Sequence, residues 1–366
     1  MKRIYVKILL LFIPIILFIL QGCVPLEIVD EIQLINAVGY DKEENNEIRG
    51  TATYPIYNPD GTIDFESFSA VSHTSRFIFS KLNTKSPKQL KNGQLRVVVF
   101  NDRFAQDGVL DIVNSLYRNP SVGNRLYMVV AEGSSKEILT KKYGSSPIPA
   151  MYLRDLIEQN IKTENLPETN LHVFLYDYYG EGLDPFLPLV KAGKDTIQLD
   201  GIALFRGDKY VGKLNHRESF IFKVLIDGSR TGQYEINLKK GKNKGYAVIR
   251  NIKGTTNYHV KKVNGIPEFH IDIKILGEIH EYPPWLNLEL PANIKLIEDT
   301  FKKDVDKQSK EMMKKFQQLH IDPLGLGDQV RRREKYWNFK DFEKNYRKLK
   351  IKVSTNIDIV ESGVIE

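Results

Sequence analysis

Cysteine is almost absent from this 366-residue chain, since Cys23 is the only one. A single thiol cannot form an intramolecular disulfide and cannot supply a cysteine-based metal cluster. Long apolar runs are also scarce: after Leu20 no stretch approaches the roughly 20 apolar residues that a membrane-spanning helix needs. The rest of the chain must therefore fold around an ordinary hydrophobic core, and Cys23 needs an explanation other than cross-linking.

The motifs of common active sites are missing as well. The seven histidines are scattered without the spacing of a zinc site, and no Gly-x-Ser-x-Gly nucleophile elbow occurs. Residues 207–214 come near a phosphate-binding loop, but Leu214 stands where that loop needs a Ser or Thr hydroxyl. Gly207 and Asp208 are instead typical of a β-hairpin turn. We therefore predict that the protein is not an enzyme and has no catalytic residues, no metal and no cofactor.

The composition is that of a globular protein with more than one domain. Hydrophobic residues make up 42% of the sequence and aromatic residues 10%, which permits a sizeable core and excludes general disorder. Chains longer than about 250–300 residues usually divide into domains. The net charge is +7, and without the N-terminal Lys2, Arg3 and Lys7 it is 7 − 3 = +4. This is mild and far from the concentrated basic face of a nucleic-acid binder, so we expect no nucleic-acid partner.

The N-terminus has the features of an export signal. Lys2, Arg3 and Lys7 accompany an apolar run of about 13 residues, from position 8 to position 20. A signal-peptide core needs about 7–15 apolar residues, whereas a membrane-spanning helix needs about 20. The length therefore favours a signal, and an uncleaved N-terminal helix is the alternative.

The lone cysteine follows this signal directly. Leu20, Gln21 and Gly22 precede Cys23, and a small residue before a cysteine at the end of an apolar run resembles the lipobox of bacterial lipoproteins. Gln21 is its one unusual position. We predict that residues 1–22 are a cleaved signal peptide. Cys23 would then carry an S-diacylglycerol and an N-acyl group that anchor the mature chain to a lipid membrane.

Hydrophobic periodicity predicts alternating strands and helices in the first half of the chain. A buried strand is expected at 94–100, followed by a helix capped by Asp102. A second strand at 125–131 and a helix at 134–143 would complete an α/β unit. The stretch 180–194 is rich in glycine and proline and is the best candidate for a linker.

The second half of the chain has a different pattern of expected secondary structure. Short strands and hairpins are expected from residue 196 onward. They lead to one amphipathic helix at 292–320, which would be about 40 Å long at 1.5 Å per residue. A final strand at 349–360 alternates apolar and polar residues, and we expect it to pair with strands from the 246–280 region.

These elements together predict an α+β, multi-domain protein with mixed or antiparallel sheets that each pack against helices, and one long amphipathic helix near the C-terminus. We expect an N-terminal domain at 23–190 and a C-terminal domain at 196–366. A further division of the second domain into 196–240 and 245–366 stays open.

Several segments make the chain similar to a known family. An apolar strand ends in Gly39-Tyr40-Asp41, and the segment 200–205 is followed by Gly212-Lys213-Leu214. The long helix is followed by Asp322-Pro323-Leu324-Gly325-Leu326-Gly327. In these features the chain resembles the spore germination lipoprotein family Ger(x)C, the C subunits of spore germinant receptors. Val24-Pro25 is a departure, because the family usually has Trp-Asp directly after the cysteine.

The resemblance implies a non-enzymatic receptor subunit needed for spore germination. It would be anchored through Cys23 on the outer face of the inner spore membrane and would work with two integral-membrane germinant-receptor subunits. The residues alone indicate only an exported, lipid-anchored, multi-domain protein without a visible active site. They leave open a lipid-anchored enzyme of the cell envelope and a substrate-binding lipoprotein.

Overall fold

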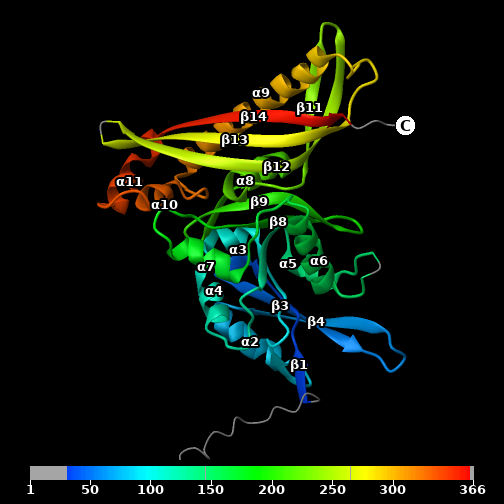
Figure 1. Ribbon diagram of the computed structural model, residues 1–366. Coiled ribbons are helices and arrows are strands. Elements are labelled where there is room, and N and C mark those ends of the chain that lie inside the picture. Colours follow the sequence, from blue (N-terminus) through cyan, green and yellow to red (C-terminus); the bar gives the residue numbers. More distant parts are fainter. Residues whose placement is uncertain (1–30, 145, 264, 363–366) are drawn as a thin grey trace, which may run out of the picture.

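The computed structural model describes residues 31–144, 146–263 and 265–362 (Figure 1). It is a mixed α+β structure with two large sheets, each packed against helices, as expected from the sequence. Figure 1 shows the sheets at opposite ends of the molecule, with the chain entering at one end through β1 (Ile32–Leu34). This short strand pairs in parallel with β5 (Gln89–Lys91).

The first sheet has eight strands. Its inner strands β2, β6, β7 and β8 are mutually parallel, and antiparallel strands continue it on both sides. Val97, Val98, Val99 and Phe100 are fully buried, as befits a strand that is covered on both faces. In spatial order the strands are β10 (Lys209–Leu214), β9 (Ile197–Arg206), β8 (Phe186–Ala192), β7 (Tyr127–Glu132), β6 (Val97–Asn101), β2 (Ala37–Lys42), β3 (Ile48–Tyr57) and β4 (Ile63–Ser72).

Helices cover both faces of this sheet. One face carries α2 (Ser75–Asn83), α3 (Asp102–Asp107), α4 (Leu110–Tyr117) and α7 (Leu171–Tyr179). The other face carries α5 (Ser135–Thr140) and α6 (Pro149–Lys162). The strand–helix–strand–helix order expected from the sequence is therefore confirmed.

The helix expected to be capped by Asp102 differs in detail. Asn101 is the cap, because its side chain accepts a hydrogen bond from the Phe104 N–H at 2.8 Å. The helix also divides into α3 and α4 at Gly108, whose φ of 125° is outside the helical range. Periodic apolar residues on both sides of this glycine gave the sequence the appearance of one continuous helix.

The prediction of a linker at 180–194 is wrong. Residues 186–192 of this stretch form β8, in which Leu187, Leu189 and Val190 are fully buried. Strand β7 pairs with β8 only from Leu189 onward, so Pro188 stands before the paired stretch on that side. Because β8 and β9 pair antiparallel, the eight-stranded sheet continues across the expected boundary between 190 and 196.

The second sheet has four strands in the order β11 (Gln233–Lys240), β12 (Asn243–Val263), β13 (Ile266–Glu281) and β14 (Lys350–Ser362). The last strand runs parallel to β13, which confirms the expected pairing of the C-terminal segment. The long helix is also confirmed as α9 (Pro291–Leu319), and it packs through its apolar stripe.

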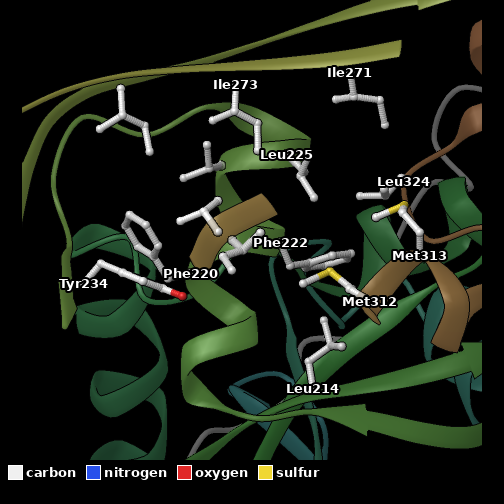
Figure 2. Close-up of a cluster of buried hydrophobic side chains, with 14 of the residues drawn as sticks. Leu214, Phe220, Phe222, Leu225, Tyr234, Ile271, Ile273, Met312, Met313 and Leu324 are labelled. Atoms are coloured by element: carbon white, nitrogen blue, oxygen red, sulfur yellow. The ribbon is translucent and has the colours of Figure 1, made fainter. Parts of the chain in front are cut away.

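Helix α8 (His216–Asp227) was not expected from the sequence. Its start is fixed by a capping box, in which Asn215 and Glu218 each bond the other's backbone N–H. Figure 2 shows Phe220, Phe222 and Leu225 of this helix among side chains from α9 and β13. The same hydrophobic cluster also contains residues of β8 and β9, so one continuous core joins the two sheets.

Candidate functional site: the junction of the two sheets

The lipobox predicted from the sequence, Leu20, Gln21, Gly22 and Cys23, lies outside the described residues. Across residues 31–362, apart from positions 145 and 264, no helix is both long and apolar enough to cross a membrane. The same part of the chain has no group of three or more His, Cys, Asp or Glu side chains that could hold a metal ion.

The segment that resembled a phosphate-binding loop is a β-hairpin, as predicted. Gly207 has a φ of 59° at the turn between β9 and β10, and Leu214 is fully buried. The lysine of the near-motif, Lys213, forms ion pairs with Glu132 at 2.5 Å and Asp200 at 3.1 Å. Its ammonium group is therefore paired with carboxylates of the same sheet.

The segment after α9 forms a compact turn. Helix α9 ends at His320, whose φ of 56° is left-handed. The side chain of Asp322 then bonds to the backbone of the residues that follow it. Its two oxygens accept hydrogen bonds from the Leu326 N–H at 2.9 Å and the Gly327 N–H at 2.7 Å. These bonds set the start of α10 (Leu326–Arg331), and Asp322 is buried.

A second aspartate ties this turn to the eight-stranded sheet. The carboxylate of Asp184, just before β8, accepts hydrogen bonds from the Asp322 N–H at 2.7 Å and the Gly207 N–H at 2.9 Å. Its own N–H donates to the Asp322 carbonyl at 3.1 Å. Three segments that are distant in sequence, around residues 184, 207 and 322, are therefore joined at one point.

Two glycines permit this approach. A Cβ on Gly182 would lie 2.6 Å from the Cα of Gly327, and a Cβ on Gly327 would lie 2.6 Å from the Cα of Gly182. Gly182 also has a φ of 75°, which disfavours any residue with a side chain. The backbones are thus in direct contact, and the Asp328 N–H donates to the Gly182 carbonyl at 3.4 Å.

The junction is rich in acidic groups with raised pKa values. Burial raises the pKa of Asp322 to about 7 and that of Asp184 to about 6. Asp177, on the neighbouring α7, has its pKa raised to about 7 by burial and by the nearby charges of Asp184 and Asp227. A further acidic residue, Asp328, forms ion pairs with Arg331 at 2.5 Å and Arg332 at 2.6 Å.

A buried pair of carboxylates with raised pKa values is also a feature of some active sites. Here, however, each of the four carboxylate oxygens of Asp184 and Asp322 accepts a backbone N–H. The adjoining cavity has a volume of about 190 Å³, below the roughly 300–1,000 Å³ of typical ligand pockets. Each of these oxygens therefore already has a backbone partner, which is the arrangement of a structural joint.

The sequence pointed to the segment 322–327 as one of those that carry the family resemblance, but it gave no sign of the partner segment at Gly182 and Asp184. The only signal was the glycine and proline content of that stretch, which indicated a linker instead.

Comparison with known proteins identifies the family of this chain. A family model described as spore germination protein N-terminal domain matches residues 26–192, and one described as spore germination B3/GerAC like, C-terminal, matches residues 200–363. The chain belongs to the spore germination B3/GerAC-like family. The two matches meet between residues 192 and 200, where the eight-stranded sheet of this family member passes from β8 to β9.

Individual family members are similar over most of their length. Spore germination protein GerQC of Bacillus cereus is 32% identical over 357 residues, which cover 98% of this chain and 99% of that protein. Spore germination protein KC of Bacillus subtilis (strain 168) is 22% identical, with 90% and 88% covered. The crystal structure of the GerBC protein shares the fold, with a TM-score of 0.58, 18% identity, and coverage of 88% of this chain and 96% of that one.

The close contact of Gly182 with Gly327 predicts that one added methyl group at Gly182 strongly lowers the stability of the fold. Gly182→Ala should reduce the free energy of unfolding by about 3 kcal/mol, because the new Cβ adds backbone strain and a clash with Gly327. Gly61→Ala is the matched control: its φ of 81° brings similar strain, but no atom lies within 4 Å of its Cβ. The control should lose only about 1 kcal/mol. Equal losses in urea unfolding of the two variants would contradict a tight junction.

The raised pKa values predict a pH effect of known sign. A carboxyl whose pKa is higher in the folded chain binds more protons there, so its contribution to stability falls as the pH rises from about 4 to about 7. Asp177→Asn removes this titration, so the variant should gain stability over the parent across that range, reaching about 1–2 kcal/mol above pH 7. Thermal unfolding between pH 4 and pH 8 measures the difference. A difference that does not change with pH would contradict the assignment.

Proposed function

We propose that this chain is a lipid-anchored, non-enzymatic subunit of a nutrient germinant receptor in the inner spore membrane. The observation that carries the proposal is the 32% identity, over 98% of the chain, to a protein named for spore germination. The lipobox that ends at Cys23 supplies the expected means of attachment. Two integral-membrane receptor subunits would be the partners.

The position of the anchor determines which end of the molecule would face the membrane. Eight residues, 24–31, separate Cys23 from β1, and the nine residue steps from Cys23 to Ile32 span at most about 30 Å when extended. The end of the molecule that carries β1 would therefore stay close to the lipid surface. Figure 1 places the four-stranded sheet and α9 at the other end, so this half would project away from the membrane.

The junction supports a role in presentation rather than catalysis. Its carboxylates are used to bond backbone N–H groups from both halves, which holds one half in a defined position on the other. An anchored scaffold of this kind would act through the surfaces that it offers to the membrane subunits. The nutrient response would then depend on the assembled receptor and not on a reaction carried out by this chain.

Deletion of the gene followed by complementation tests the proposal. Deletion should abolish germination in response to at least one amino acid or sugar, and the parent chain should restore it. Cys23→Ala should leave the fold intact but move the protein from the membrane fraction to the soluble fraction, because no acyl chain is attached. Membrane fractionation and mass spectrometry of the N-terminal peptide report this step.

Two results would count against the proposal, each against a different part. Normal germination of the deletion strain with every nutrient tested would contradict the receptor role. A mature membrane-bound protein with an unmodified Met1 would contradict the lipid anchor while leaving the receptor role intact.

A further inference from the structure

A second cavity lies beside the C-terminal half of α9 and the start of β14. Its volume is about 760 Å³, within the range of pockets that hold small ligands. Phe269, Met313 and Leu349 give it an apolar part, and all three side chains are largely excluded from solvent. The rest of its lining is mainly charged, and lysine is the commonest residue in it.

The two carboxylates in this lining are already paired. Glu268 forms an ion pair with Lys350 at 2.7 Å. Asp272 lies 3.3 Å from a ring nitrogen of His259 and 3.1 Å from one of His270, and it also accepts a hydrogen bond from the Ser354 hydroxyl. Each carboxylate of the cavity therefore already has a partner: Glu268 pairs with Lys350, and Asp272 contacts the histidine and serine side chains.

Four further lysines remain around the same cavity, namely Lys261, Lys310, Lys314 and Lys352. None of them has an ion-pair partner among residues 31–362, positions 145 and 264 excepted, and all four are exposed. Two of them lie on α9, one on β12 and one on β14. Lys310 and Lys314 are one helical turn apart, so each raises the electrostatic potential felt by the other. Lys261 and Lys352 alternate with Val260 and Ile351, which pack on the core, so they extend from the opposite face of the sheet.

We propose that this cavity binds a small anion that carries two or more negative charges in phosphate or carboxylate groups. Lysine ammonium groups act as mobile point charges that suit both kinds of group. An uncharged portion of the ligand would lie against Phe269, Met313 and Leu349. The anion is either a free solute or the headgroup of an anionic lipid. The cavity is lined by residues of α9, β12, β13 and β14, and Figure 1 shows these elements at the end of the molecule opposite β1, which favours the free solute.

Titration calorimetry of the purified full-length chain in detergent tests the proposal with two probes, inorganic pyrophosphate and citrate, at 50 mM salt. The test variant is Lys310→Gln with Lys314→Gln, which removes two charges from the cavity. The matched control is Lys302→Gln with Lys303→Gln, which removes two charges from the same helix. Both control positions are exposed and lie outside the cavity lining.

At least one probe should bind the parent and the control with affinities within twofold of each other, and the test variant should bind at least tenfold more weakly. Raising the salt to 300 mM should weaken binding to the parent, because the interaction is electrostatic. If Lys310→Gln with Lys314→Gln does not fold, the single variants Lys310→Gln and Lys314→Gln each remove one of the two charges and should each weaken binding.

Flotation of the Cys23→Ala chain with phosphatidylglycerol vesicles distinguishes the two sources of the anion. Binding of a free probe that is lost in the test variant supports a soluble ligand. Binding to the vesicles alone, lost in the test variant and kept in the control, supports a lipid headgroup. Equal losses in test and control variants, or no binding of either probe and none to the vesicles, would overturn the proposal.

Discussion

The carboxylate of Asp184 is the point on which the arrangement of the two halves depends. It accepts one N–H from the β9–β10 turn and one from the segment that follows α9, while Asp322 organises that segment from within. Asp322 is buried and Asp184 is partly buried, so both carboxylates are expensive to desolvate. The four backbone hydrogen bonds offset this cost by leaving no oxygen unpaired. The direct backbone contact of Gly182 with Gly327 follows from the same approach.

This joint gives the rest of the molecule a defined geometry. One hydrophobic cluster extends from β8 and β9 through α8 and α9 to the four-stranded sheet, so apolar packing and the aspartate hydrogen bonds act in the same place. The structure can then hold the β1 end and the lysine-lined cavity at fixed positions far apart. A membrane-anchored receptor subunit would use this separation to reach partners near the lipid and solutes farther from it.

The sequence predicted the elements whose signals are local. Helix α9 has an uninterrupted apolar stripe over 29 residues, and β14 alternates cleanly, so both were found with nearly correct ends. The resemblance to the Ger(x)C family also rested on contiguous residues, and family membership is now established. The lipobox remains a prediction, since it lies outside the described residues.

The features that the sequence did not predict depend on distant contacts. Helix α8 is buried on most of its circumference, so it lacks the polar face that marks an amphipathic helix. Strand β8 contains Pro188 and follows two glycines, and only its place inside the sheet shows that it is not a linker. Nothing near Asp184 in the sequence indicates that its partners are residues 207 and 322.

The distance between the two halves tests the central claim, which is that they form one rigid body. Spin labels on Ser115→Cys of α4 and Lys303→Cys of α9, in a Cys23→Ala background, place one probe in each half at exposed helical positions. Pulsed electron double resonance should give a single narrow distance distribution. A broad or two-peaked distribution for the folded chain would show that the halves move independently and would contradict the account.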